Sequence, residues 1–147
     1  MESVRSFEDL ECWRACRQLR IFVTQTVCPA FPKSEQYGLD SQIKRAARSA
    51  TANIAEGFGR FHYRDNYKFC SNARGSLFEV LDHLLTARDD GFIQESTLAE
   101  GRRLFERAKG LLNGYMNYLM RTANDSSGVR EDAVEYMGAV HGETHNS

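Results

Sequence analysis

Basic side chains gather in one stretch of the sequence, and cations at such density can bind phosphate. Residues 42–74 hold seven basic residues against two acidic ones. If this stretch is helical, the first three cations lie about 100° to 200° around the helix from the apolar Ile43, on the solvent side. A strip of this kind can bind RNA or DNA phosphates as counterions are released. A solvated face, or ion pairs to a neighbouring subunit, remains the alternative. The predicted nucleic-acid contacts are Lys44, Arg45, Arg48, Arg60, Arg64 and Lys68.

Aromatic and basic residues alternate within residues 60–69. Rings interleaved with cations suit unpaired bases, which stack on the rings while the cations meet phosphates. Aromatic and arginine side chains are also enriched where subunits meet, and we favour this second interpretation. The predicted oligomer interface consists of Trp13, Phe58, Phe61 and Tyr63.

Arg74 lies on the apolar stripe of its predicted helix and therefore needs a buried partner. Glu56 is the natural carboxylate and Glu8 is a second candidate, and we predict a structural ion pair between Glu56 and Arg74. These two residues have no nucleophile or metal motif beside them. The chain also has no HExxH sequence and no nucleophile elbow. We therefore expect a protein that is not an enzyme, with no cofactor and no small-molecule substrate.

The four cysteines show neither a CxxC motif nor a paired metal-ligand spacing: Cys12, Cys16, Cys28 and Cys70. We interpret them as reduced thiols in a hydrophobic core and predict no metal site. The first residues contain no signal-peptide pattern, and no run of about 18 apolar residues is present. The expected location is the cytoplasm, without membrane contact.

Apolar residues recur every three or four positions in four segments, which is the helical period. The first segment spans residues 7–28, with Ser6 as its cap and prolines at its end. The second begins at Asp40 and ends at Gly57 and Gly59. Short links favour antiparallel neighbours, so we predict an all-α, antiparallel up-down four-helix bundle. The expected core stripes are Cys12, Cys16, Leu19, Val23, Val27; Ile43, Ala47, Ala50, Ile54; Cys70, Leu77, Leu81, Leu84; and Leu98, Gly101, Phe105, Ala108, Leu112, Tyr115, Leu119.

Charge divides the chain into two parts. Residues 1–122, the predicted bundle domain, carry 18 basic and 15 acidic residues. Residues 123–147 carry one basic and five acidic residues, and we expect a flexible polar tail with a short helix over 130–140. The opposite charges suggest that this tail folds back onto the basic strip and inhibits it.

Several strings resemble a known family. They are GLDSQIKRAARSATANIAEGFGR (38–60), DNYKFCSNARGSLFEVLDHLL (65–85), FEDLECW (7–13) and LLNGYMNYL (111–119), of which NIAEGFGR and ARGSL are the most specific. Together they resemble the four-helix bundle proteins encoded in intervening sequences of bacterial 23S ribosomal RNA genes. The resemblance implies a ring-shaped homopentamer and a link to nucleic acid, with no established enzymatic activity. Similar bundles are accessory subunits of diversity-generating reverse transcriptases.

Two functions of different classes follow from these observations. The first is a self-assembling, non-enzymatic bundle that binds RNA or DNA through its basic strip. The alternative is a protein-interaction module, such as an accessory subunit of a reverse transcriptase, that does not itself contact nucleic acid. Salt distinguishes them, because phosphate binding weakens steeply as the salt concentration rises.

Overall fold

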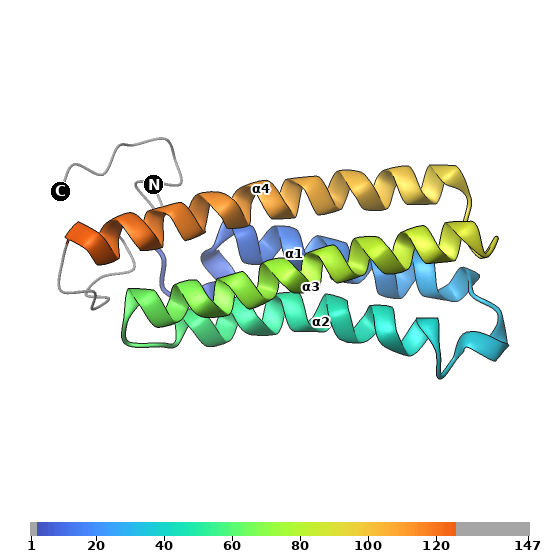
Figure 1. Ribbon diagram of the computed structural model, residues 1–147, viewed down its shortest axis with the longest axis horizontal. Helices are drawn as coiled ribbons and strands as arrows, with labels where there is room; N and C mark the ends of the chain where they lie inside the picture. The colour runs from blue at the N-terminus through green and yellow to red at the C-terminus, as the bar shows by residue number, and fades with distance from the viewer. Residues whose placement is uncertain (1–2, 126–147) are drawn as a thin grey trace.

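The computed structural model describes residues 3–125; residues 1–2 and 126–147 lie outside that description. Within the described range the chain forms four α-helices and no strand, which confirms the all-α helical bundle (Figure 1). The helices are α1 (Glu11–Phe22), α2 (Leu39–Phe58), α3 (Tyr63–Asp89) and α4 (Glu95–Asp125). Short 3₁₀ or π segments occupy Phe7–Asp9, Val23–Val27, Cys28–Ala30 and Lys33–Glu35. Helix α4 extends past the predicted domain boundary at residue 122, and the helix expected over 130–140 lies outside the described residues.

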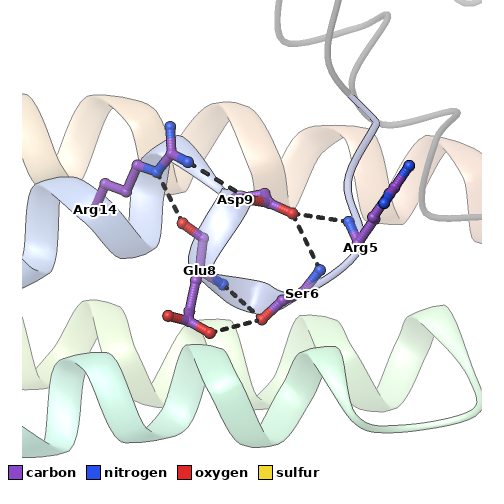
Figure 2. A network of polar contacts seen from close by, with 5 residues as sticks. All are labelled: Arg5, Ser6, Glu8, Asp9 and Arg14. Carbon is purple, nitrogen blue, oxygen red and sulfur yellow. Dashed lines mark hydrogen bonds and ion pairs between the residues drawn. The ribbon is translucent and has the colours of Figure 1, made fainter.

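The chain enters the bundle through a capped turn rather than directly through α1 (Figure 2). The Ser6 hydroxyl accepts from the Glu8 N–H at 3.2 Å, and the Asp9 carboxylate accepts from the Ser6 N–H at 3.2 Å. These reciprocal bonds form a capping box. Arg14 of α1 donates to the Glu8 carbonyl at 2.8 Å and pairs with Asp9 at 3.5 Å. The cap predicted at Ser6 therefore exists, but it caps a 3₁₀ turn that ends before α1.

The first predicted helix is divided into segments. At its far end, the Cys28 N–H bonds to the Val23 carbonyl five residues earlier, which is a π-type widening. Pro29 follows directly, has no N–H to donate, and its ring crowds the carbonyl four residues before it. The α-helical ladder therefore ends before the proline, while the chain continues in the same general direction.

The core consists of the faces that the periodicity predicts. All of the predicted stripe residues are buried except Leu81, which is half-buried against the same core. Because every helix contributes one apolar face, burying these faces against each other is what holds the bundle together. None of the helices within residues 3–125 has the length and apolar character needed to cross a lipid bilayer.

Two details at the ends of α2 differ from the prediction. Gly38 is the N-cap, and Asp40 lies inside the first turn instead of capping it. Gly57 is a buried helical residue, while Gly59 forms the C-cap. A Cβ on Gly57 would lie 2.6 Å from the Asn66 Oδ1 and 3.0 Å from the Asn66 carbonyl oxygen. Gly57 is needed for close approach of α2 and α3, and not for ending the helix.

Contacts between helices define their relative directions. The Ser76 hydroxyl of α3 donates to the Ser49 hydroxyl of α2 at 2.9 Å. Further along the same two helices, Gly57 of α2 lies against Asn66 of α3. As residue numbers fall on α2 they rise on α3, so the two helices run in opposite directions. Arg74 contacts Asn113 while Arg64 contacts Asn124, and α3 and α4 therefore also run in opposite directions.

Candidate nucleic-acid interface

The six predicted phosphate contacts form two groups instead of one continuous strip. The first group lies in the first half of α2, and the second lies around the turn from α2 to α3. Twelve residues separate Arg48 from Arg60, which corresponds to about 18 Å along a helix axis. The groups are Lys44, Arg45, Arg48 and Arg60, Arg64, Lys68.

Helix α1 adds cations to the first group. The Arg20 Nη1 donates to the Thr51 hydroxyl at 2.8 Å, and the Thr51 hydroxyl donates to the Arg48 carbonyl at 3.1 Å. This chain of contacts places Arg20 within one helical turn of Arg48. Arg17 is exposed and lies three residues before Arg20, on the same side of α1. We define the α1–α2 basic face as Arg17, Arg20, Lys44, Arg45 and Arg48.

The sequence prediction missed the contribution of α1. A signal was present, because Arg14, Arg17 and Arg20 recur at intervals of three, which places them on neighbouring parts of one helix face. The sequence did not show that α1 packs beside the basic part of α2. The contact of Arg20 with Thr51 joins this row to the row on α2.

Charges on the α1–α2 basic face are only slightly neutralised. Lys44 pairs with Asp40 at 2.8 Å, and this hydrogen bond raises the pKa of Lys44, which stays protonated. Within residues 3–125, the four arginines of the face have no carboxylate partner. Cys28 packs beside Asp40 and Lys44, and burial raises the pKa of its thiol to about 11. The face therefore presents four guanidinium groups and one ammonium group with a single nearby carboxylate partner.

The second group is more strongly tied to its own helices. Arg60 pairs with Glu56 at 3.2 Å and lies over the Phe69 ring, 4.6 Å from its centroid. Arg64 donates to the Asn124 side chain of α4 at 3.1 Å. Lys68 is exposed on α3, about one turn further along. These contacts use part of the donor capacity of the second group for intramolecular bonds.

The four aromatic residues predicted for an oligomer interface differ in how exposed they are. Phe61 is 69% exposed at the turn between α2 and α3. Trp13 and Phe58 are half-buried against the core. Tyr63 is 3% exposed and packs edge-on against Tyr118 of α4, so its assignment to the interface was wrong. Tyr63 is the first residue of α3, and its ring packs against α4 rather than facing a second subunit.

The predicted ion pair between Glu56 and Arg74 is also wrong. Glu56 pairs with Arg60, one turn further along its own chain. The Arg74 Nε instead donates to the Asn113 side chain of α4 at 2.9 Å, and its guanidinium lies over the Phe78 ring. The alignment of α2 against α3 explains this difference. Ser49 lies opposite Ser76, close to Arg74 along α3, whereas Glu56 is two helical turns further along α2. Arg74 faces α4 and not α2.

All four cysteines are buried and free. Burial raises the pKa of Cys16 and Cys70 to about 12, and it also raises the pKa of Cys12 well above its ordinary value. Their thiols are therefore protonated at neutral pH and poor nucleophiles. Across residues 3–125, no three His, Cys, Asp or Glu side chains group in a way that could hold a metal ion.

The architecture is that of an all-helical bundle protein with a basic face made by its first two helices. A family model described as 23S rRNA-intervening sequence protein matches residues 8–114. Because this match covers most of the chain, the protein belongs to that family, as the sequence resemblance predicted. A search of curated proteins returned no match.

Proposed function

We propose that this protein is a non-enzymatic bundle that binds RNA or DNA through the α1–α2 basic face. The observation that carries the proposal is the contact of Arg20 with Thr51, which places the cations of α1 beside those of α2. Two adjacent rows of cations can follow a phosphate backbone in a way that a single helix face does not. Contacts of this kind attract nucleic acid without reading its sequence.

The test is a binding titration with a fluorescently labelled RNA oligonucleotide and with its DNA equivalent, at about 50 and 200 mM salt. The double variant R17E/R48E reverses two exposed charges of the face. Affinity should fall by at least about tenfold, and the slope of log K against log salt should become shallower by about two.

The matched control is R107E/R121E, which reverses two exposed arginines of α4, a helix that contributes no residue to the face as defined. The net charge changes equally in both variants, so a loss confined to R17E/R48E supports the proposed site. Equal losses in the two variants would mean attraction by total charge alone and would contradict the assignment. Absence of binding by the unchanged protein at low salt would contradict the function itself.

A second proposal is self-assembly, in the homopentamer that the family resemblance implies, with Phe61 as a contact. It is supported by an apolar ring that is 69% exposed beside Arg60 and Arg64, the combination enriched where proteins meet. Phe61→Ala should lower the mass measured by sedimentation, while Tyr37→Ala, which removes another exposed ring, should leave it unchanged. A single protomer at high concentration of the unchanged protein would contradict this proposal. The alternative role as an accessory subunit of a nucleic-acid enzyme would use the same ring to dock a protein.

A further inference from the structure

A buried hydroxyl at the contact between α1 and α2 holds one arginine side chain in place. Thr51 of α2 is 3% exposed. Its hydroxyl donates to the Arg48 carbonyl at 3.1 Å, which selects one of the two rotamers that threonine adopts in a helix. The oxygen of this hydroxyl accepts from the Nη1 of Arg20 on α1 at 2.8 Å. The direction of the hydroxyl is therefore fixed by α2, and the hydroxyl in turn fixes the guanidinium group.

Most of the hydrogen-bonding capacity of Arg20 is left free by this contact. A guanidinium group has five N–H donors. Among residues 3–125, Thr51 is the single hydrogen-bond partner of the Arg20 side chain, and no carboxylate pairs with it. Because the contact uses Nη1, the edge formed by Nε and Nη2 keeps two parallel N–H groups. Such an edge matches the two charged oxygens of a phosphodiester.

The arginines of the α1–α2 basic face lack acidic neighbours on their own helices. Side chains three and four positions apart on a helix face each other. At these distances from Arg17, Arg20, Arg45 and Arg48 the sequence holds no acidic residue, and several of the positions hold another cation. Like charges at this spacing destabilise a helix. The free protein therefore contains a repulsion that a bound anion would relieve.

The carboxylates of this part of the chain have other partners or lie further away. Those of α1, α2 and the segment between them are Glu11, Glu35, Asp40 and Glu56. Asp40 pairs with Lys44 at 2.8 Å, while Glu56 pairs with Arg60 at 3.2 Å. Glu35 accepts from the Leu39 N–H at 3.0 Å, at the start of α2. Glu11 lies six residues before Arg17, which is about one and a half helical turns.

We propose that Thr51 positions the Arg20 guanidinium to bind a phosphodiester of the nucleic acid backbone. The inference rests on the proposed function, since it concerns the same basic face. An exposed arginine loses side-chain freedom when it binds a ligand, and this loss weakens binding. Arg20 has lost that freedom during folding, so its bond to phosphate has a smaller entropic cost than the bonds of the exposed Arg17 and Arg48. Thr51 is buried and acts through Arg20 without contacting the ligand.

Thr51→Val tests the inference, because it removes the hydroxyl while it keeps the branched shape and every cation. In the titration with labelled RNA, affinity should fall about three- to tenfold. The slope of log K against log salt should stay the same, since the number of cations is unchanged. Thr51→Ser keeps the acceptor and should bind within about twofold of the unchanged protein. Circular dichroism verifies that each variant remains helical.

Thr24→Val is the matched control. Thr24 is exposed on the same side of the molecule, and its hydroxyl donates to the Arg20 carbonyl at 3.0 Å without contacting the guanidinium. This variant should keep its affinity within about twofold. A second control places Thr51→Val in an Arg20→Ala background. Arg20→Ala alone should make the salt slope shallower by about one, and Thr51→Val should then have no further effect.

Three outcomes would contradict the inference, and two of them leave the proposed function intact. Unchanged affinity of Thr51→Val, in a protein whose binding R17E/R48E still weakens, would overturn the positioning role alone. An equal loss from Thr51→Val with and without Arg20 would mean that Thr51 acts through the fold, and would overturn that role as well. Absence of RNA binding by the unchanged protein at low salt would contradict the proposed function, and this inference with it.

Discussion

Asn66 of α3 donates a 2.8 Å hydrogen bond from its Nδ2 to the hydroxyl of Tyr115 on α4, inside the bundle. Both residues are buried. The Oδ1 of the same amide accepts from the Cys70 thiol at 3.5 Å, and Gly57 of α2 packs directly against it. One buried amide therefore connects three of the four helices. Because buried polar groups are costly unless paired, this group fixes the relative positions of those helices.

Removing the Tyr115 hydroxyl should destabilise the bundle. In Tyr115→Phe the Asn66 amide loses its acceptor while it stays buried, which costs about 1 to 3 kcal/mol of unfolding free energy. Urea unfolding followed by circular dichroism measures the change. Tyr37→Phe is the control, since Tyr37 is 89% exposed and its hydroxyl can bond to water. Equal stability of Tyr115→Phe and the unchanged protein would contradict the structural role of this bond.

Gly57 should not tolerate even one methyl group. In Gly57→Ala the new Cβ would lie 2.6 Å from the Asn66 Oδ1 and 2.8 Å from the Phe69 Cβ. Because the Asn66 backbone also lies at 3.0 Å, the two helices must separate, at a cost of about 1 to 3 kcal/mol. A lower midpoint of thermal unfolding is the expected observation.

The same substitution at Gly110 should have the opposite sign. Nothing lies within 4 Å of a Cβ there, so alanine gains helix propensity of up to about 1 kcal/mol. Measuring both variants under identical conditions separates steric contact from propensity. If Gly57→Ala were stabilised like Gly110→Ala, the close approach of α2 to α3 would be wrong.

The helices and their buried faces were predictable because an apolar period of three to four residues is a local property of the chain. Ile43 and Phe105 were assigned to the core from spacing alone, and both are buried. The same helical spacing places Arg45 and Arg48 on the solvent side of their helix, and both are exposed.

What was not predictable depends on the register between helices. The partner of Arg74 depends on which residue of α4 lies opposite it, and no periodicity within α3 determines that. The burial of Tyr63 has the same cause, since α4 covers it. The addition of Arg20 to the basic face likewise depends on how α1 packs on α2. Side chains that join helices are therefore found only when the packing is known.

Arg74 and Asn113 should be energetically coupled, whereas Arg74 and Glu56 should not. The first pair shares a part-buried hydrogen bond of 2.9 Å, for which a coupling of about 0.5 to 1.5 kcal/mol is expected. Double-mutant cycles with alanine at each position, measured by urea unfolding, provide the comparison. Glu56 belongs to an exposed pair with Arg60 and gives the control cycle. A larger coupling of Arg74 with Glu56 than with Asn113 would restore the pairing that the sequence suggested.

Stability should fall in alkaline solution because of the buried thiols. Burial raises the pKa of Cys16 and of Cys70 from 9.0 to about 12. Between these values the unfolded chain loses the thiol protons while the folded protein retains them, so the folded state binds more protons. The free energy of unfolding therefore decreases as the pH rises through this window, by up to about 1.4 kcal/mol per pH unit for each thiol. Urea unfolding at several pH values above 9, under reducing conditions, measures the slope.

Cys70→Ala should make this pH slope shallower. Val80→Ala, another truncation of a buried α3 residue, should lower the stability at every pH and leave the slope unchanged. A slope that Cys70→Ala leaves unaltered would mean that this thiol ionises as readily in the folded protein as in the unfolded chain, contrary to its burial.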